Sequence, residues 1–231
     1  MYHPVWFSAL KRLTLSDTAI PRTILRCAHN NIAVYSPHSA LDAAGGGIND
    51  WIAKGLANGE TYTCTPIFPA KNINWDSNTQ GPLPQSLVNA GDGRLVTLEA
   101  MVSLSELVDR VKNHFNIPNI RLGLPPRTLR DREDGWGGVS ISTIGVCAGH
   151  GSILEKQSPP AQAWVAGELS HHQVLAAVQR GIYVILTEHS NCERGYLPVL
   201  RQRLLDILIG KGWNGVDIVI SKMDRDPLFI V

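Results

Sequence analysis

The segment TEHSNCERG has residue types and a spacing that suit a metal site. His189 and Glu193 are four residues apart across an expected strand-to-helix turn, so the imidazole and the carboxylate can converge on one point. Zinc, iron, manganese and nickel accept such ligands, whereas histidine disfavours magnesium and calcium. The alternative is a capping box from Ser190 to Glu193, in which Glu193 only satisfies a backbone N–H at the start of a helix. The spacing alone leaves both interpretations open.

Two further segments place similar side chains directly after expected strands. SPHSALD contains His38 and Asp42, and Asp42 is equally suited to beginning a helix. In GELSHH, Glu168 ends a strand while His171 and His172 begin a helix. Neighbouring residues of a helix point about 100° apart, so at most one of the two histidines can face a given site.

The remaining polar signals are weaker. In the loop CAGHGS, Gly149 and Gly151 would let backbone N–H groups approach an anion, although a tight turn explains the glycines equally well. His29 and His114 lie near expected helix ends, where a cation interacts favourably with the helix dipole, so we expect structural roles for both. The four cysteines are widely spaced without a CxxC pair, which favours neither a zinc knuckle nor a secreted disulfide framework.

A regular alternation of strands and helices in the second half of the chain must position these side chains, which predicts an α/β layer structure. We expect strands at 94–100, 119–125, 139–148, 163–168, 183–188 and 215–221, and helices at 103–115, 170–180 and 191–209. In the first half we expect helices at 18–29 and 48–56, a strand at 32–35, and hairpins and loops from 58 to 93. Ligands collect at the carboxyl ends of strands in open α/β sheets, which is where the histidines and carboxylates fall.

Composition narrows the function classes. The 231 residues hold 21 Lys and Arg against 20 Asp and Glu, so the formal charge of +1 speaks against general nucleic-acid binding. The longest stretch without a charged side chain, residues 135–154, contains six glycines and does not predict a membrane span. The chain is expected to be globular and to work in a reducing compartment.

The motifs HxxxD, GExSHH and EHSNxERG occur in this order, and together with the opening YHPVWFSALKR and the segment YSPHSALDAA they resemble the family known as GTP cyclohydrolase 1 type 2, or NIF-three-like. The resemblance implies a two-lobed α/β fold with mixed sheets and flanking helices, divided into lobes at residues 1–93 and 94–231. The first lobe is expected to be loop-rich after residue 57. Family members carry several tens of residues before the position of Met1, so we expect the family's first strand or strands to be missing here.

The resemblance also implies a dinuclear metal site in the cleft between the lobes, to which the second lobe contributes His189 and Glu193. The implied metal ligands are His3, Asp42, His189 and Glu193, with Glu193 bridging two ions. Tyr2 stands where the family has the first histidine of its His-His-Pro motif, and His150 stands where a small residue is usual. His150 is a possible extra ligand.

The function implied by the resemblance is hydrolysis of a small molecule by water that one or two divalent transition-metal ions activate, the metal being zinc, iron, manganese or nickel. Glu193, Glu168 and His172 are the expected catalytic residues, the last two as proton carriers. The alternative is an interaction protein, such as a scaffold for a transcriptional regulator, with a degenerate metal site. We expect ring-like homo-oligomers, a possible protein partner and no membrane association, in the cytoplasm or else in mitochondria or the nucleus.

Overall fold

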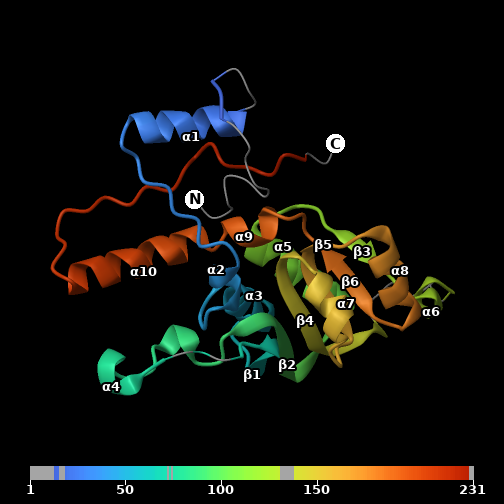
Figure 1. Ribbon diagram of the computed structural model, residues 1–231. Helices are drawn as coiled ribbons and strands as arrows, with labels where there is room; N and C mark the ends of the chain where they lie inside the picture. Colours follow the sequence, from blue (N-terminus) through green and yellow to red (C-terminus); the bar gives the residue numbers. More distant parts are fainter. Residues whose placement is uncertain (1–12, 16–18, 72, 74, 131–137, 229–231) are drawn as a thin grey trace. The chain divides into compact units, whose positions relative to one another are not determined.

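The computed structural model describes residues 13–15, 19–71, 73, 75–130 and 138–228 (Figure 1). The chain divides into two compact units, Met1–Leu41 and Asp42–Val231. The two lobes expected from the sequence, with a boundary at residue 93, stay a prediction. All residues of the site described below, from Asp42 onward, belong to the second unit.

The first unit contains the helix α1, Ala19–His29, close to the helix expected at 18–29. The strand expected at 32–35 is wrong, because these residues have no regular secondary structure and leave Ile32 57% and Tyr35 78% exposed. Their β-branched and aromatic side chains favour a strand only where a neighbouring strand is available for pairing. The boundary between the units falls within the short helix α2, Ser39–Ala43, after Leu41, so Asp42 is the first residue of the second unit.

The second unit is built on one mixed sheet with the strand order β1-β2-β4-β5-β6-β3. The parallel pairs β4–β5 and β5–β6 form its centre, while β1, β2 and β3 pair antiparallel on the two sides. The strands are β1 Tyr62–Pro69, β2 Gly91–Ser103, β3 Arg121–Gly123, β4 Ser140–His150, β5 Ala163–Glu168 and β6 Tyr183–Leu186. The expected mixed α/β fold is therefore confirmed, and β1 lies in the stretch where only hairpins and loops were expected.

Helices cover both faces of the sheet, which explains why β5 and β6 are apolar over most of their length. Helices α3, Ile48–Ala57, and α5, Leu104–Phe115, pack together against β2 and β4. Helices α7, Ser152–Gln157, and α8, His171–Gln179, lie on the opposite face (Figure 1). That second layer encloses a core around Trp164, which is fully buried.

Two helices begin at serine caps. The hydroxyl of Ser103 accepts a hydrogen bond from the Glu106 amide at the start of α5. Ser170 and Gln173 form a complete capping box at α8. The single long helix expected at 191–209 is divided into two helices, α9, Asn191–Arg194, and α10, Leu197–Gly210. The remaining helical elements are α4 Ser77–Gln80, the 3-10 turn Gln85–Leu87 and α6 Pro126–Arg130.

The structural role expected for His114 fits its packing, but the expected strand at 215–221 is wrong. His114, one residue before the end of α5, is partly buried with its ring centroid 4.0 Å from that of Trp51, and burial lowers its pKa to about 4, so it does not act as a cation at the helix dipole. The strand expected at 215–221 is absent, since these residues join no sheet and leave Val219 79% exposed. Instead the carbonyl of Ile218 accepts a hydrogen bond from Arg201 of α10.

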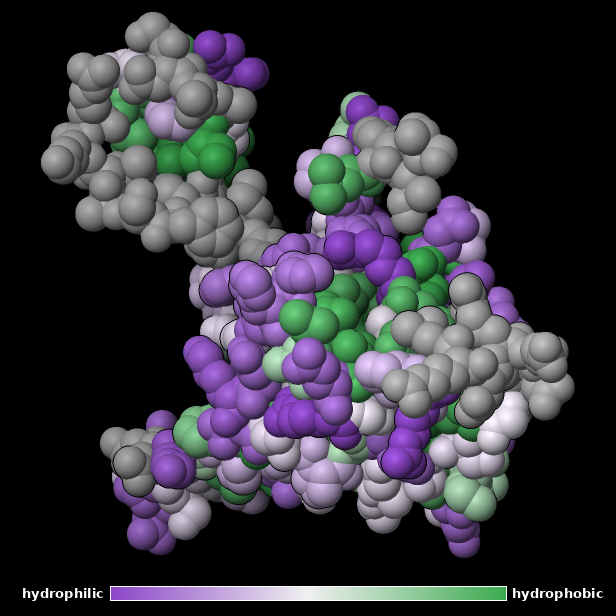
Figure 2. Space-filling view, turned by 90° about the vertical axis from the view of Figure 1, so that its right-hand side faces the viewer, coloured by the Kyte–Doolittle hydropathy of each residue, from purple (hydrophilic) through white to green (hydrophobic). Residues whose placement is uncertain are grey.

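The surface combines polar and apolar areas. Figure 2 shows hydrophobic residues gathered in the middle of one face with hydrophilic residues around them. None of the residues of α10 is buried, and Ile207, Ile209 and Trp213 are each more than half exposed. Within the part of the chain that the structure describes, none of the helices combines the length and hydropathy needed to cross a bilayer.

Candidate functional site

An unusual backbone conformation directs His189 towards the carboxyl edge of the sheet. After β6, the amide of Thr187 still bonds to Ala166 at 3.1 Å and that of Glu188 to Gly167 at 2.9 Å. Glu188 then adopts a φ of +70°, which is rare for a residue with a side chain and is found where surrounding contacts enforce it. One such contact is the ion pair between the Arg121 Nε of β3 and the Glu188 Oε1, at 2.8 Å.

The His189 ring lies between two carboxylates. Its Nδ1 is 2.8 Å from the Oε1 of Glu168, the last residue of β5. Its Nε2 is 3.4 Å from the Oε1 of Glu193, in the first turn of α9. In the tautomer whose Nδ1 donates to Glu168, the lone pair of the ring is on Nε2, on the side of Glu193. The sequence motifs that supply these three residues therefore meet in space.

Glu193 is buried, with only 7% of its side chain exposed, and it does not lie in a capping box with Ser190. Ser190 makes no side-chain hydrogen bond to the start of α9. Its hydroxyl instead donates to Oδ2 of Asp226 at 2.8 Å. The capping alternative for this segment is therefore wrong, and the Glu193 carboxylate is turned towards His189.

Gly149 provides the space that these two side chains occupy. A Cβ at this position would lie 2.7 Å from the Glu193 Oε1 and 2.9 Å from the His189 Nε2, and the φ of Gly149 is +60°. Both the close approach and the left-handed backbone require glycine. The end of β4 at Gly149 therefore packs directly on the histidine and the glutamate.

Gly149 lies near the end of β4, where the pairing with β5 is irregular between Cys147 and His150, and a turn follows at Gly151. The amides of this segment donate within the protein: Ala148 to Oδ1 of Asn49 at 2.8 Å, Gly149 to the Cys192 sulfur at 3.0 Å, and Gly151 to the Glu168 carbonyl at 2.9 Å. Cys192 in turn donates to the His189 carbonyl at 3.0 Å. The engaged amides speak against an anion cradle; the expected turn forms at Gly151, while Gly149 serves close packing.

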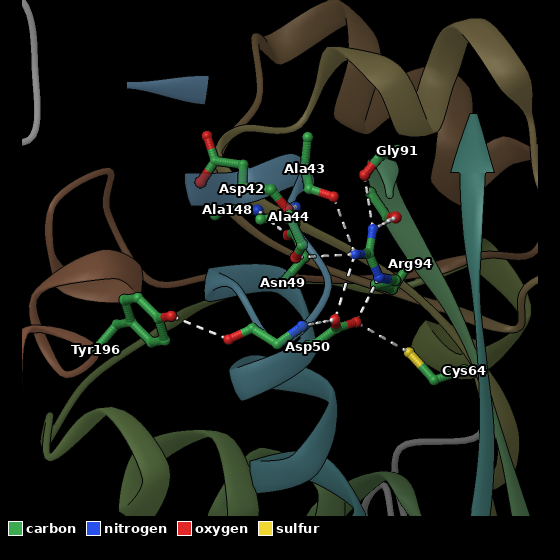
Figure 3. Close-up of polar contacts among 12 residues, drawn as sticks. Asp42, Ala43, Ala44, Asn49, Asp50, Cys64, Gly91, Arg94, Ala148 and Tyr196 are labelled. Atoms are coloured by element: carbon green, nitrogen blue, oxygen red, sulfur yellow. Dashed lines mark hydrogen bonds and ion pairs between the residues drawn. The ribbon is translucent and has the colours of Figure 1, made fainter. Parts of the chain in front are cut away.

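Asp42 lies far from His189 and Glu193 in the sequence but acts electrostatically on the same cysteines as Glu193. Its backbone carbonyl accepts a hydrogen bond from the Asn49 side chain at 3.1 Å (Figure 3). Burial raises the pKa of the Cys147 thiol to about 12, and the negative charges of Asp42 and Glu193 add to the effect. The pKa of Cys192 is also raised by burial and by the same two carboxylates. Asp42 and Glu193 therefore act on one pair of thiols.

A buried ion pair holds the segment that follows Asp42. The Arg94 side chain, 1% exposed, pairs with Asp50 of α3 and also donates to the carbonyls of Ala43 and Ala44, each at 3.4 Å (Figure 3). Sequence reasoning missed both Asn49 and Arg94. The apolar spacing of Ile48, Trp51 and Ile52 marks this stretch as a helix, and nothing in that spacing shows that a polar neighbour is buried.

The remaining candidate residues are exposed, lie in the first unit or fall outside the described residues. His171 and His172 are both exposed at the start of α8, with their ring centroids 5.5 Å apart. His150 is exposed at the end of β4, opposite Glu168 in the strand pairing. His38 lies in the first unit with a φ of +46°. Tyr2 and the proposed ligand His3 lie outside the described residues.

Among the described residues, no group of three or more His, Cys, Asp or Glu side chains has the arrangement of a complete metal site. Of the expected ligands, His189 and Glu193 place their Nε2 and Oε1 atoms 3.4 Å apart. The expected ligand His3 lies outside the described residues.

Comparison with known proteins identifies the family. Residues 1–227 match the family model described as Duf34/NIF3 (NGG1p interacting factor 3). The chain is 32% identical to the human NIF3-like protein 1, with all of this chain and 76% of the relative covered. It is 37% identical to the NIF3 homolog of Schizosaccharomyces pombe, with 98% of this chain and 74% of the relative covered.

Solved structures agree on the fold. A hypothetical protein of Staphylococcus aureus superimposes with a TM-score of 0.75 at 20% identity, covering 100% of this chain and 78% of that one. A Bacillus cereus protein related to NIF3 gives a TM-score of 0.73 at 18% identity, with coverages of 100% and 82%. Reduced HcgD from Methanocaldococcus jannaschii gives 0.61 at 22% identity, with coverages of 89% and 68%. The family model matches residues 1–227, and the human and Schizosaccharomyces pombe relatives align with all or nearly all of this chain. The chain therefore belongs to the Duf34/NIF3 family.

Proposed function

We propose that the chain is a metal-dependent hydrolase acting on a small molecule, with His189, Glu193 and Asp42 as metal ligands and His3 as a further ligand. The observation that carries this proposal is the distance of 3.4 Å between the His189 Nε2 and the Glu193 Oε1. It exceeds the usual hydrogen-bond range of about 2.7–3.2 Å. Two ligands about 2.1 Å from one tetrahedral ion are themselves about 3.4 Å apart.

The surroundings of the pair fit a metal. A carboxylate on the second nitrogen of a metal-binding histidine is the usual outer support for such a ligand, and Glu168 provides it at 2.8 Å. Gly149 keeps the volume beside both donors free of a side chain. The donor set of imidazole and carboxylate suits zinc, iron, manganese or nickel, up to two ions per chain.

In the proposed reaction, Glu168 fixes the His189 ring, and Glu193 supplies buried negative charge. A divalent metal bound there would polarise a carbonyl, imine-like or phosphoryl group and supply water activated for attack near neutral pH. Glu168, whose side chain is 42% exposed, and the exposed His172 are the proposed groups that accept and return a proton. Glu168 would thus combine orientation of the ring with proton transfer.

The test is the metal content of the purified full chain. We expect one to two transition-metal ions per chain by elemental analysis, and loss of at least one in the variants Glu193→Gln and His189→Gln. Glu99→Gln is the matched control, because this exposed carboxylate of β2 lies outside the site. Fewer than one ion per chain, unchanged by Glu193→Gln, would overturn the proposal.

The same outcome would favour a second function, a protein-binding scaffold. A Saccharomyces cerevisiae relative, 33% identical over 99% of this chain and 72% of its own length, is named NGG1-interacting factor 3. The exposed apolar side chains of Ile207, Ile209 and Trp213 fit contact with a protein, either a second copy in a homo-oligomer or a different partner.

A further inference from the structure

We propose that Asn49 is a positioning residue that sets where Asp42 lies relative to His189 and Glu193. This inference rests on the proposed metal site and extends it to a side chain that would not itself touch the metal. The juxtaposition that supports it is a single buried amide that bonds to both segments bordering the site.

The amide of Asn49 is almost fully buried, with 1% of the residue exposed, and both of its polar atoms are used. Nδ2 donates to the carbonyl of Asp42 at 3.1 Å. Oδ1 accepts the amide hydrogen of Ala148 at 2.8 Å (Figure 3). One side chain therefore joins the backbone of α2 to the backbone near the end of β4.

Both bonds end at the residues that matter for the site. Ala148 is followed by Gly149, whose Cα faces the Glu193 carboxylate and the His189 ring so closely that a Cβ would collide with both. The other bond fixes the backbone of Asp42 itself. A displacement of Asn49 would therefore alter the separation between Asp42 and the His189–Glu193 pair.

Other contacts maintain the fold in this region, so the role of Asn49 is separable from overall stability. The apolar face of α3 is anchored by Ile48, Ile52 and Leu56, each no more than 1% exposed. Arg94 holds the next two carbonyls after Asp42 without help from Asn49. Among the described residues, the side chain of Asn49 bonds to the Asp42 carbonyl and the Ala148 amide.

Asn49→Asp is the informative substitution, because it keeps the size and the acceptor but replaces the donor to Asp42 with a carboxylate oxygen. Asn49→Ala removes both bonds. The control is Arg110→Gln. Arg110 of α5 donates to the carbonyls of Leu56 and Ala57, which lie at the opposite end of α3 from Asn49. Co²⁺ titration of each full-length variant, followed by visible absorption, gives affinity, stoichiometry and ligand geometry, and thermal unfolding gives stability.

We expect Asn49→Asp to bind Co²⁺ about 10- to 100-fold more weakly than the wild type, with an altered absorption band, as is typical when support of a metal ligand is lost. Arg110→Gln should lower the unfolding temperature and leave Co²⁺ affinity and the absorption band unchanged. If Asn49→Ala does not fold, Asn49→Asp still decides the question.

The outcomes separate the two proposals. Absence of Co²⁺ binding by the wild type, or binding that Glu193→Gln does not weaken, would overturn the proposed function. Wild-type binding that the Asn49 variants share unchanged would overturn only the positioning role. Equal weakening in Arg110→Gln at equal loss of stability would also overturn it, because Asn49 would then act through the fold alone.

Discussion

At the N-terminal end of α3, the Asn49 side chain bonds to the backbone of Asp42 and to the backbone of β4 at Ala148. The next residue, Asp50, pairs with Arg94. At the C-terminal end, Arg110 of α5 donates to the carbonyls of Leu56 and Ala57. Both ends bury polar side chains against backbone groups. They differ in what those backbone groups belong to: the candidate site at one end, the contact between α3 and α5 at the other. The same physical device can therefore serve chemistry or packing.

The largest effect is expected from Arg94→Met. This change leaves Asp50, 28% exposed, without its partner and removes the donor to Ala43 and Ala44. Breaking a buried pair costs about 3–5 kcal/mol, and the partial exposure of Asp50 reduces this to about 2–4 kcal/mol of unfolding free energy. Urea unfolding measures the loss, and the double variant with Asp50→Asn should recover part of it. A loss below about 1 kcal/mol would contradict a structural role for the pair.

A pH titration tests the C-terminal end of the comparison. Burial lowers the pKa of His114 to about 4 from its usual value of 6.5, and its Nε2 has no hydrogen-bond partner among the described residues. The unfolded chain therefore binds a proton at higher pH than the folded one. Stability from this group is complete above about pH 6.5 and is lost as the pH falls towards 4.

A shift of this size corresponds to about 3 kcal/mol at most, and partial exposure of the ring reduces the expected loss to about 1–3 kcal/mol. Unfolding by urea at pH 7, 6, 5 and 4 measures it. His114→Gln should flatten the slope between pH 6.5 and 4. An identical slope in both proteins would show that other groups cause the pH dependence.

The smallest effects on stability are expected from paired glycine substitutions at the two ends. Gly55→Ala would place a Cβ 2.2 Å from the His114 ring, and Gly149→Ala one 2.7 Å from Glu193. Each should cost about 1–2 kcal/mol of unfolding free energy, because the neighbours must move. Only Gly149→Ala should weaken Co²⁺ binding, by at least about tenfold. Equal effects of the two variants on Co²⁺ binding would remove the distinction between the ends.

The sequence predicts the parts of the fold that local patterns determine. The expected strand at 163–168 coincides with β5, and the helices expected at 103–115 and 170–180 correspond to α5 and α8. The expected strands at 32–35 and 215–221 are absent, because alternation of side chains does not show whether a partner strand exists.

The candidate site divides in the same way. His189, Glu193 and Glu168 could be selected from motifs, and they meet in the structure. The burial of Asn49 depends on contacts with residues seven positions before it and 99 after it, so no local pattern reveals it. The structural role expected for His114 follows from its position near a helix end, whereas the contact with Trp51 that explains its low pKa is not visible in any local pattern.

The sulfur of Cys192 offers a way to observe motion at the site. It accepts the Gly149 amide and donates to the His189 carbonyl, is fully buried, and has a raised pKa, so an alkylating reagent finds almost no thiolate in the closed state. Labelling of Cys192 at neutral pH would require the end of β4 at Gly149 to separate from His189. The rate of labelling therefore measures how often this region opens locally, and any compound that binds to both segments would slow it.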